Sequence, residues 1–322
     1  MSTHRHGSAS ARGLLLLLLG VATGCSGGGG PSIGGGIGGT SAVQGPITGF
    51  GSVIVGGIEF DTAGASVVID GDSVTAADLK LGMVATVRGD VERGTGRGTA
   101  TSIVADDLLQ GPIETLDVAA GRLTAMGQIV LTDDGTVFDP APLAALAPGD
   151  VALVDGFLDA ESRVRATRIE LRTSDIEFEV KGFVRDLDPA AQTFRINALT
   201  VDYADASIER VPVEGLSNGL FVEVDLTEAP VGGRGTADSV DVLDPVLMAD
   251  PGDGLKVQGF VTQVVSPTEF VVGVGQRVRT DGTTRFENGG PEDVVINAQV
   301  DVTGVAEEDG ALRATEVELV VP

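Results

Sequence analysis

The side chains of this protein that could do chemistry are mostly carboxylates, because histidine and cysteine are nearly absent. The only histidines are His4 and His6, and the only cysteine is Cys25. All three lie in an N-terminal segment of the kind that is removed or modified on export, so we expect an exported chain with no histidine and no free thiol. This excludes Ser-His-Asp and Cys-His catalysis, zinc sites built from His and Cys, haem ligation and iron–sulfur clusters.

Carboxylates, hydroxyls, lysines and the single tyrosine, Tyr203, remain as catalytic candidates. Two carboxylates can suffice for a glycosidase. A cleft that stacks sugars is usually lined by aromatic rings, however, and this chain has no Trp and only 4% aromatic residues. We therefore predict that the protein is not an enzyme and has no cofactor, with a carboxylate-based hydrolase as the least favoured alternative.

Calcium is the better hypothesis for a site, because its ligands in proteins are oxygens. The candidate pairs are Asp70 with Asp72 and Asp133 with Asp134, and a third acidic cluster is Glu307, Glu308 and Asp309. None of them spells a D-x-D-x-D-G loop, and each lies beside a glycine where a hairpin is expected to turn. Ordinary polar turns are therefore the competing interpretation.

The charge of the chain is strongly one-sided. Acidic side chains outnumber basic ones by 47 to 21, and the formal net charge is −26. Such a surface repels nucleic-acid phosphates and anionic lipid head groups. We predict no nucleic-acid partner, and a membrane contact only through a lipid anchor. An acidic surface suits divalent cations or cationic partners, and plain solubility is the simpler explanation.

Residues 1–24 predict a secretion signal. His4, Arg5, His6 and Arg12 precede six consecutive leucines at 14–19, and the apolar run is too short to span a membrane. The ending Ala22-Thr-Gly-Cys25 resembles the lipobox of bacterial lipoproteins. This resemblance implies a lipidated Cys25, and the serine after it favours the outer membrane, on its periplasmic or surface side. An ordinary signal with an unrelated cysteine nearby is the alternative.

Residues 25–43 are rich in glycine and serine. Such a segment cannot bury a core, and we predict a flexible tether between the lipidated cysteine and the folded part.

The rest of the chain consists of four copies of one sequence repeat. The openings are Gly45-Pro-Ile47, Gly111-Pro-Ile113, Gly182-Phe-Val184 and Gly259-Phe-Val261, and 55 residues separate each opening Gly from a closing Ala, at Ala100, Ala166, Ala237 and Ala314. A third anchor lies between them at Gly82, Gly149 and Gly219, and Asn297-Ala298 replaces it in the last unit. Three anchors in phase over four copies establish an internal repeat.

The period-two pattern within the first unit predicts strands at about 47–55, 57–60, 66–69, 83–91 and 99–108. The segment 74–81 is a short helical candidate, and 142–146 takes that place in the second unit. Five strands with a short helix between the third and fourth is the order of an OB-fold barrel. We predict an all-β protein of four tandem five-stranded OB-like barrels, modules 1 to 4, at 44–109, 110–175, 176–246 and 253–322. A β-sandwich or an open β-roll stays as an alternative.

The run GFGSVIVGGIEFDT followed by ASVVIDG and DLKLGMVATVRG, within residues 49–89, resembles the bacterial domain-of-unknown-function family 5666. The resemblance is closest in the first unit and covers the four units together. It implies an OB-like fold in tandem copies and a secreted or lipid-anchored location. It implies no activity and no catalytic residues.

The sequence therefore predicts a non-catalytic, lipid-anchored protein of the bacterial cell envelope, whose repeated β modules bind or scaffold an unknown protein or glycan partner. The alternative is a surface adhesion or matrix component that depends on a divalent cation, with calcium as the ion.

Overall fold

The structure is a computed structural model that describes residues 37–174, 176–244 and 246–320. The predicted signal peptide, Cys25 and the predicted tether as far as residue 36 lie outside the described residues. Within them the chain folds into strands joined by turns, with no α-helix. The described part accordingly holds no helix of a length and hydropathy that would cross a membrane.

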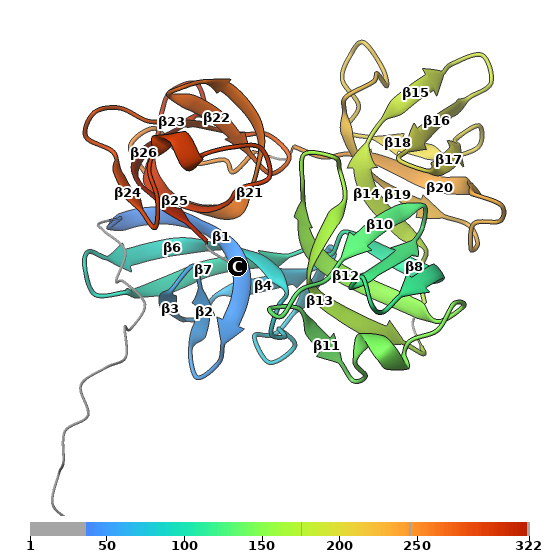
Figure 1. Cartoon of the computed structure of the whole chain (residues 1–322), viewed down its shortest axis with the longest axis horizontal. Coiled ribbons are helices and arrows are strands. Elements are labelled where there is room, and N and C mark those ends of the chain that lie inside the picture. Colours follow the sequence, from blue (N-terminus) through green and yellow to red (C-terminus); the bar gives the residue numbers. More distant parts are fainter. Residues whose placement is uncertain (1–36, 175, 245, 321–322) are drawn as a thin grey trace, which may run out of the picture. The chain divides into compact units, whose positions relative to one another are not determined.

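Module 1 is a closed five-stranded barrel, which Figure 1 shows together with the other three modules. Its barrel strands are β1 (Gly39–Gly49), β2 (Val53–Val55), β3 (Ile58–Asp61), β6 (Val84–Glu92) and β7 (Arg97–Ala105). The sheet runs β1-β2-β3-β7-β6 and returns to β1, with only β3 and β7 parallel. This is the strand order of the OB fold, and closure leaves the barrel without an open sheet edge. A hairpin of β4 (Ser66–Ile69) and β5 (Asp72–Val74) adds to β7.

The other three modules repeat this topology. Module 2 contains β8 (Leu109–Asp117), β9 (Arg122–Ala125), β10 (Gln128–Leu131), β11 (Val137–Asp139), β12 (Val151–Leu158) and β13 (Val164–Arg172). Module 3 contains β14 (Glu179–Phe183), β15 (Arg185–Asp188), β16 (Thr193–Ile196), β17 (Leu199–Asp202), β18 (Ser207–Glu209), β19 (Phe221–Leu226) and β20 (Arg234–Val242). Module 4 contains β21 (Gly254–Ser266), β22 (Glu269–Val272), β23 (Gln276–Arg279), β24 (Arg285–Glu287), β25 (Gln299–Ala306) and β26 (Leu312–Leu319). The prediction of an all-β chain of OB-like barrels is confirmed.

The short helix predicted at 74–81 in module 1 is wrong, whereas the segment predicted at 142–146 in module 2 contains a short 3-10 helix. Residues 76–78 form a turn in module 1, and the corresponding places in modules 2 and 4 hold single-turn 3-10 helices, η1 (Leu143–Ala145) and η2 (Pro291–Asp293). Helix nucleation is unfavourable for so few residues. In module 1 the Asp78 carboxylate also accepts hydrogen bonds from the Thr75 amide at 3.0 Å and the Thr75 hydroxyl at 2.7 Å. These bonds close one turn that begins at Thr75, and the chain does not continue this turn into a helix.

The first strand begins inside the segment predicted to be a tether. β1 starts at Gly39, and the side chains of Ile37, Ala42 and Val43 are buried. β1 pairs with β6 over residues 39–46, so these backbone groups are satisfied by the barrel. Residues 37–43 therefore belong to the folded part, because their few apolar side chains have a barrel to pack against.

The third anchor of the repeat is a left-handed backbone position. Gly82, Gly149 and Gly219 have φ of 83°, 97° and 93°, and Asn297 has φ of 67°. Each donates its N–H to a carbonyl of the first strand, at Ile47, Ile113, Val184 and Val261 respectively. Asn297, and not Ala298, is thus the counterpart of the glycines, and asparagine tolerates this conformation better than other non-glycine residues.

The closing Ala marks a β-bulge in the fifth strand of every barrel. The register shifts opposite Arg88/Gly89, Asp155/Gly156, Asp225/Leu226 and Thr303/Gly304. At Gly89, Gly156 and Gly304, an added Cβ would lie 2.0–2.2 Å from a carbonyl oxygen of that strand. A glycine in the fourth strand therefore lets the bulge approach closely.

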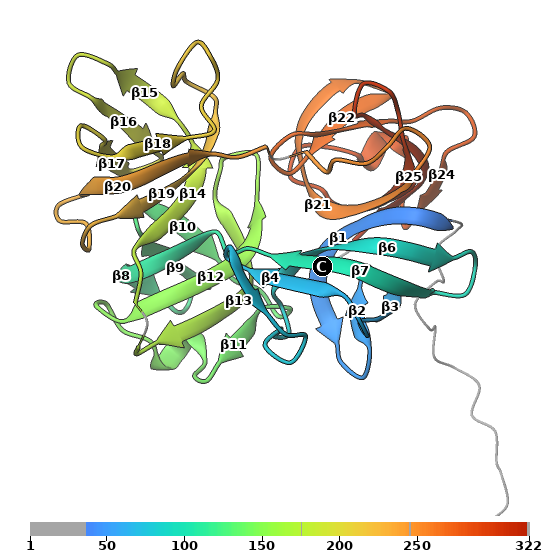
Figure 2. The same ribbon diagram turned by 180° about the vertical axis from the view of Figure 1, so that it is seen from behind.

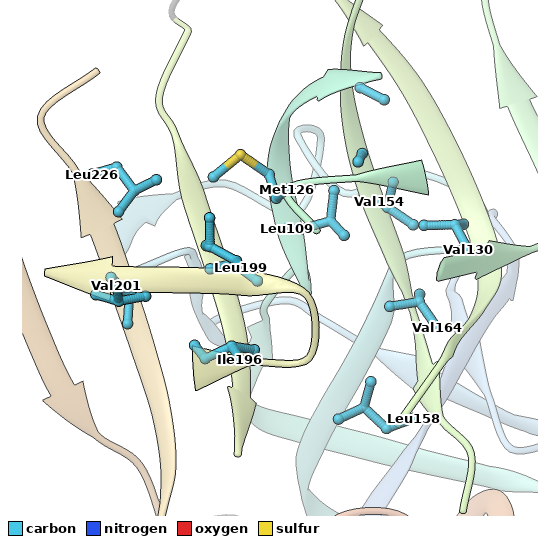
Figure 3. Close-up of a cluster of buried hydrophobic side chains, with 14 of the residues drawn as sticks. Leu109, Met126, Val130, Val154, Leu158, Val164, Ile196, Leu199, Val201 and Leu226 are labelled. Atoms are coloured by element: carbon cyan, nitrogen blue, oxygen red, sulfur yellow. The ribbon is translucent and has the colours of Figure 1, made fainter. Parts of the chain in front are cut away.

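Strand pairing also joins modules to one another. β1 pairs in parallel with β21, over Ser41–Gln44 and Gly254–Val257, and Figure 2 shows β1 between β6 and β21. β8 pairs with β14 through Gln110 and Leu109. Modules 2 and 3 also share one continuous apolar core, in which Leu109 and Met126 of module 2 lie near Leu199 of module 3 (Figure 3).

Candidate functional site

Asp133 and Asp134, one of the predicted calcium pairs, lie in an exposed turn after β10. The Asp133 carboxylate accepts a hydrogen bond from the Gly135 amide at 2.8 Å. The same bond recurs at the same place in the other modules, from Ala63 to Asp61, from Ala204 to Asp202 and from Thr283 to Asp281. Its recurrence in all four copies gives Asp133 the role of a turn residue.

The acidic cluster near the C-terminal hairpin is neutralised by arginine. The Arg279 guanidinium donates at 2.7 Å to Glu307 Oε2 and at 2.7 Å to Asp309 Oδ2. The hydrogen bond from Arg279 to Asp309, together with one from the Ala311 amide, holds the pKa of Asp309 well below its usual range. The cluster already has its cation.

The remaining predicted calcium pair, Asp70 and Asp72, does not come together in the structure. The side chain of Asp72 is exposed in β5, whereas Asp70 turns toward a buried group of charges. Asp70 Oδ1 accepts a hydrogen bond from the Asp107 amide at 2.9 Å. We call this group the junction cluster; it comprises Asp70, Asp107, Asp155, Glu179, Lys181, Glu223 and Asp225. Modules 1, 2 and 3 and the link between β7 and β8 all contribute to it.

Lys181 is the central cation of the junction cluster. Its Nζ lies 2.6 Å from Glu179 Oε1, 3.3 Å from Glu223 Oε2 and 3.7 Å from Asp70 Oδ1. Burial alone would disfavour its charge, but the surrounding carboxylates outweigh burial and hold the pKa of Lys181 well above 10.5. Lys181 is therefore charged at every physiological pH.

Carboxyl groups outnumber this one ammonium. Burial raises the pKa of Glu179 to about 7 and that of Asp155 to about 8, and neighbouring carboxylates add to both effects. Burial likewise raises the pKa of Asp107 well above its usual range. Among the described residues, no hydrogen-bond donor reaches Asp107 Oδ1 or Asp155 Oδ2. The junction cluster thus has more buried carboxyl groups than its one ammonium can keep ionised.

The sequence did not predict this cluster beyond Asp70, yet the repeat contains a signal for it. The residue before each opening glycine lies directly across from a residue of the fourth barrel strand. These facing pairs are Gln44–Thr86, Gln110–Leu153, Lys181–Glu223 and Gln258–Asp301. Only module 3 replaces the glutamine with a lysine, and a comparison of the four copies would have singled out Lys181.

A cavity of about 980 Å³ adjoins the junction cluster. Asp70, Asp107, Lys181 and Glu223 line one part of it, and apolar side chains such as Phe157 and Val272 line another. All four modules contribute to its wall. A cavity with excess carboxylates suits a cation, and carboxyl groups with raised pKa values in a cavity are also one requirement of acid–base chemistry.

Three oxygens of the junction cluster are close enough to share a metal ion. One carboxylate oxygen each of Glu179, Glu223 and Asp225 lies within 4.8 Å of the other two. These are hard oxygen donors of the kind that calcium and magnesium prefer.

A family model described as a domain of unknown function, DUF5666, matches the chain four times, over residues 42–104, 110–170, 178–241 and 258–318. No curated protein is similar to the chain. Among solved structures, drosophila Unr CSD456 is 17% identical over 66% of this chain and 97% of that one, with a TM-score of 0.17. So low a TM-score supports no structural comparison, and the OB-like fold rests on the strand pairing described above.

Proposed function

This chain belongs to the DUF5666 family, and from that premise we propose that it is a non-catalytic, lipid-anchored protein of the bacterial cell envelope. Its four modules act as one scaffold that binds a protein or glycan partner. The family match covers more than three quarters of the chain with repeated β modules.

The observation that carries the scaffold proposal is the direct bonding between modules. Strand pairing links β1 to β21 and β8 to β14. Side chains add to these links: the Asn297 amide accepts from the Ala160 N–H at 2.9 Å and donates to Glu161 at 2.8 Å, which ties module 4 to module 2. The Arg165 guanidinium lies 5.1 Å from the ring centre of Phe260. Such links favour a fixed arrangement of the four modules over modules that are joined only by flexible linkers.

The anchoring part of the proposal is tested at the lipidation residue. We expect Cys25→Ala to move the protein from the membrane fraction to the soluble fraction, because no other part of the proposal attaches it to the bilayer. Ser26→Ala is the matched control and should leave the protein in the membrane fraction. Unchanged membrane association of Cys25→Ala would refute the lipid anchor.

The non-catalytic part is tested with the purified chain and a panel of glycan, ester and peptide substrates. We expect no turnover. Turnover would overturn this part, and its loss in Glu179→Gln would establish a carboxylate-based hydrolase at the junction cluster.

The second candidate function is adhesion that depends on a divalent cation. It is favoured by one observation, the excess of buried carboxylates in the junction cluster. Calcium-dependent binding of cells or matrix glycans to the purified chain would support it, and binding that is unchanged by a chelator would exclude it.

A further inference from the structure

The carboxylates Glu179, Glu223 and Asp225 form a compact group on two neighbouring strands. Glu179 faces Asp225 and Lys181 faces Glu223 in the pairing of β14 with β19. Residues two apart on a strand point to the same face, so these four side chains lie on one side of the sheet. The fold therefore holds their oxygens together without help from a flexible loop.

Lys181 neutralises only part of this group. Its ammonium is shared among Glu179, Glu223 and Asp70. Asp225 has the hydroxyl of Ser239 as a donor at 2.6 Å, which is a neutral partner. The guanidinium of Arg168, which acts on Asp155 of the junction cluster, is held by Asp139 and Glu170 at 2.7 Å each. Among the described residues, no lysine or arginine therefore forms an ion pair with Asp225, and the one ammonium of Lys181 is divided among three carboxylates.

A second observation, independent of the three carboxylates, also points to a cation as the ligand. Asp107 is only 4% exposed, lines the same cavity as Glu223 and Lys181, and has an oxygen, Oδ1, that no donor of the described residues reaches. A buried carboxylate oxygen without a partner is costly. Glu179, one of the three carboxylates, is among the groups that act on Asp107 electrostatically.

We propose that the junction cluster is a calcium site, in which Glu179, Glu223 and Asp225 supply the ligands and Asp107 offers a further, unpartnered oxygen beside them. Calcium takes six to eight oxygen ligands in flexible geometry, so three carboxylates with water can hold it. The described residues around the group offer oxygen donors and no sulfur or imidazole, which favours a hard cation. The proposal concerns the junction cluster alone and depends neither on the lipid anchor nor on adhesion.

Lys181 has a specific part in this site. It is the built-in competitor of the metal, because its ammonium contacts two of the three ligands. The other three modules have glutamine at the same position, namely Gln44, Gln110 and Gln258. Lys181→Gln is therefore compatible with the barrel and removes the competing charge, so calcium binding should become tighter.

The test is calcium titration of the detergent-purified full chain after treatment with a chelator. We expect one site with a Kd on the order of 10⁻⁴–10⁻³ M, as in extracellular calcium modules, and a higher Tm with calcium than without it. Glu223→Gln and Asp225→Asn should each weaken binding by about tenfold or more, since affinity follows the number of charged ligands. Asp133→Asn, at the exposed turn, is the matched control and should bind as the unaltered chain does.

Lys181→Gln keeps the proposal falsifiable if either ligand variant fails to fold. Calcium affinity that rises in Lys181→Gln supports the site, and affinity that is unchanged or lower overturns it. Absence of calcium binding by the unaltered chain overturns it as well, as does binding that Asp133→Asn removes. None of these outcomes bears on membrane fractionation or on substrate turnover, so failure here is distinguishable from failure of the proposed function.

Discussion

Asp155 shows how strongly this fold can perturb a single side chain. It lies on β12 beside the bulge, is 2% exposed, and has an oxygen, Oδ2, without a donor among the described residues. The charged groups that act on it are Asp70, Arg168, Glu170 and Lys181. Burial dominates over all of them and raises its pKa to about 8. At neutral pH the carboxyl is therefore mostly protonated.

This pKa predicts a pH dependence of stability. The folded chain binds the Asp155 proton more tightly than the unfolded chain, whose pKa is near the ordinary 3.8, so this group makes stability fall as pH rises from about 4 to about 8. The slope from one proton is at most about 1.4 kcal/mol per pH unit. Asp155→Asn cannot ionise and should lose this component. Urea unfolding at about pH 5 and about pH 8 measures it.

Relative to the unaltered chain, Asp155→Asn should gain stability at the higher pH. Because both proteins keep Asp107 and Glu179, the difference between them isolates Asp155. A difference that stays constant over the two pH values would contradict the prediction.

Strands and turns were the part of the structure that the sequence could predict. The alternation of apolar and polar residues, the opening glycines and the closing alanines are local signals in the sequence. They recur because each barrel needs the same turn and the same bulge. The helix predicted at 74–81 failed because so short a segment does not offset the cost of helix nucleation, and only a single turn forms after Thr75. The junction cluster could not be predicted in full. Its members come from positions 70 to 225, and pairing between modules leaves no periodic trace in the sequence.

The bulge in the fifth strand makes a prediction at the scale of the element. Gly304→Ala should destabilise the protein by about 2–3 kcal/mol, because the new Cβ would lie 2.1 Å from the Arg313 carbonyl oxygen and the two strands would have to separate. Gly282→Ala, in the same module, is the matched control. An added Cβ there meets nothing within 4 Å, and the φ of Gly282 is not in the left-handed region, so stability should change by less than about 1 kcal/mol.

Chemical denaturation of both variants measures the two effects. Equal stability losses in Gly304→Ala and Gly282→Ala would show that the close approach at the bulge is not a constraint.

At the scale of the whole described chain, the boundaries of the hydrophobic cores do not coincide with the boundaries of the four sequence repeats. Four modules repeat, but the buried apolar residues form three clusters: one in module 1, one mainly in module 4, and one that runs through modules 2 and 3. Modules 2 and 3 should therefore unfold as one cooperative unit, although each closes its own barrel. Cooperative units of this kind follow shared buried surface and not sequence repeats.

Leu199→Ala tests this shared core. Leu199 belongs to module 3, is fully buried, and lies beside module 2, where the backbone of Gly127 approaches it closely. Its truncation should cost about 2–5 kcal/mol. In native-state hydrogen exchange, the amides of β9 and β10 in module 2 should then lose protection together with those of β16 and β17, while β6 and β7 of module 1 keep theirs. Phe60→Ala, in the core of module 1, should give the opposite pattern. If Leu199→Ala affected only strands of module 3, each barrel would be its own cooperative unit, and the links between modules would be contacts between independently stable domains.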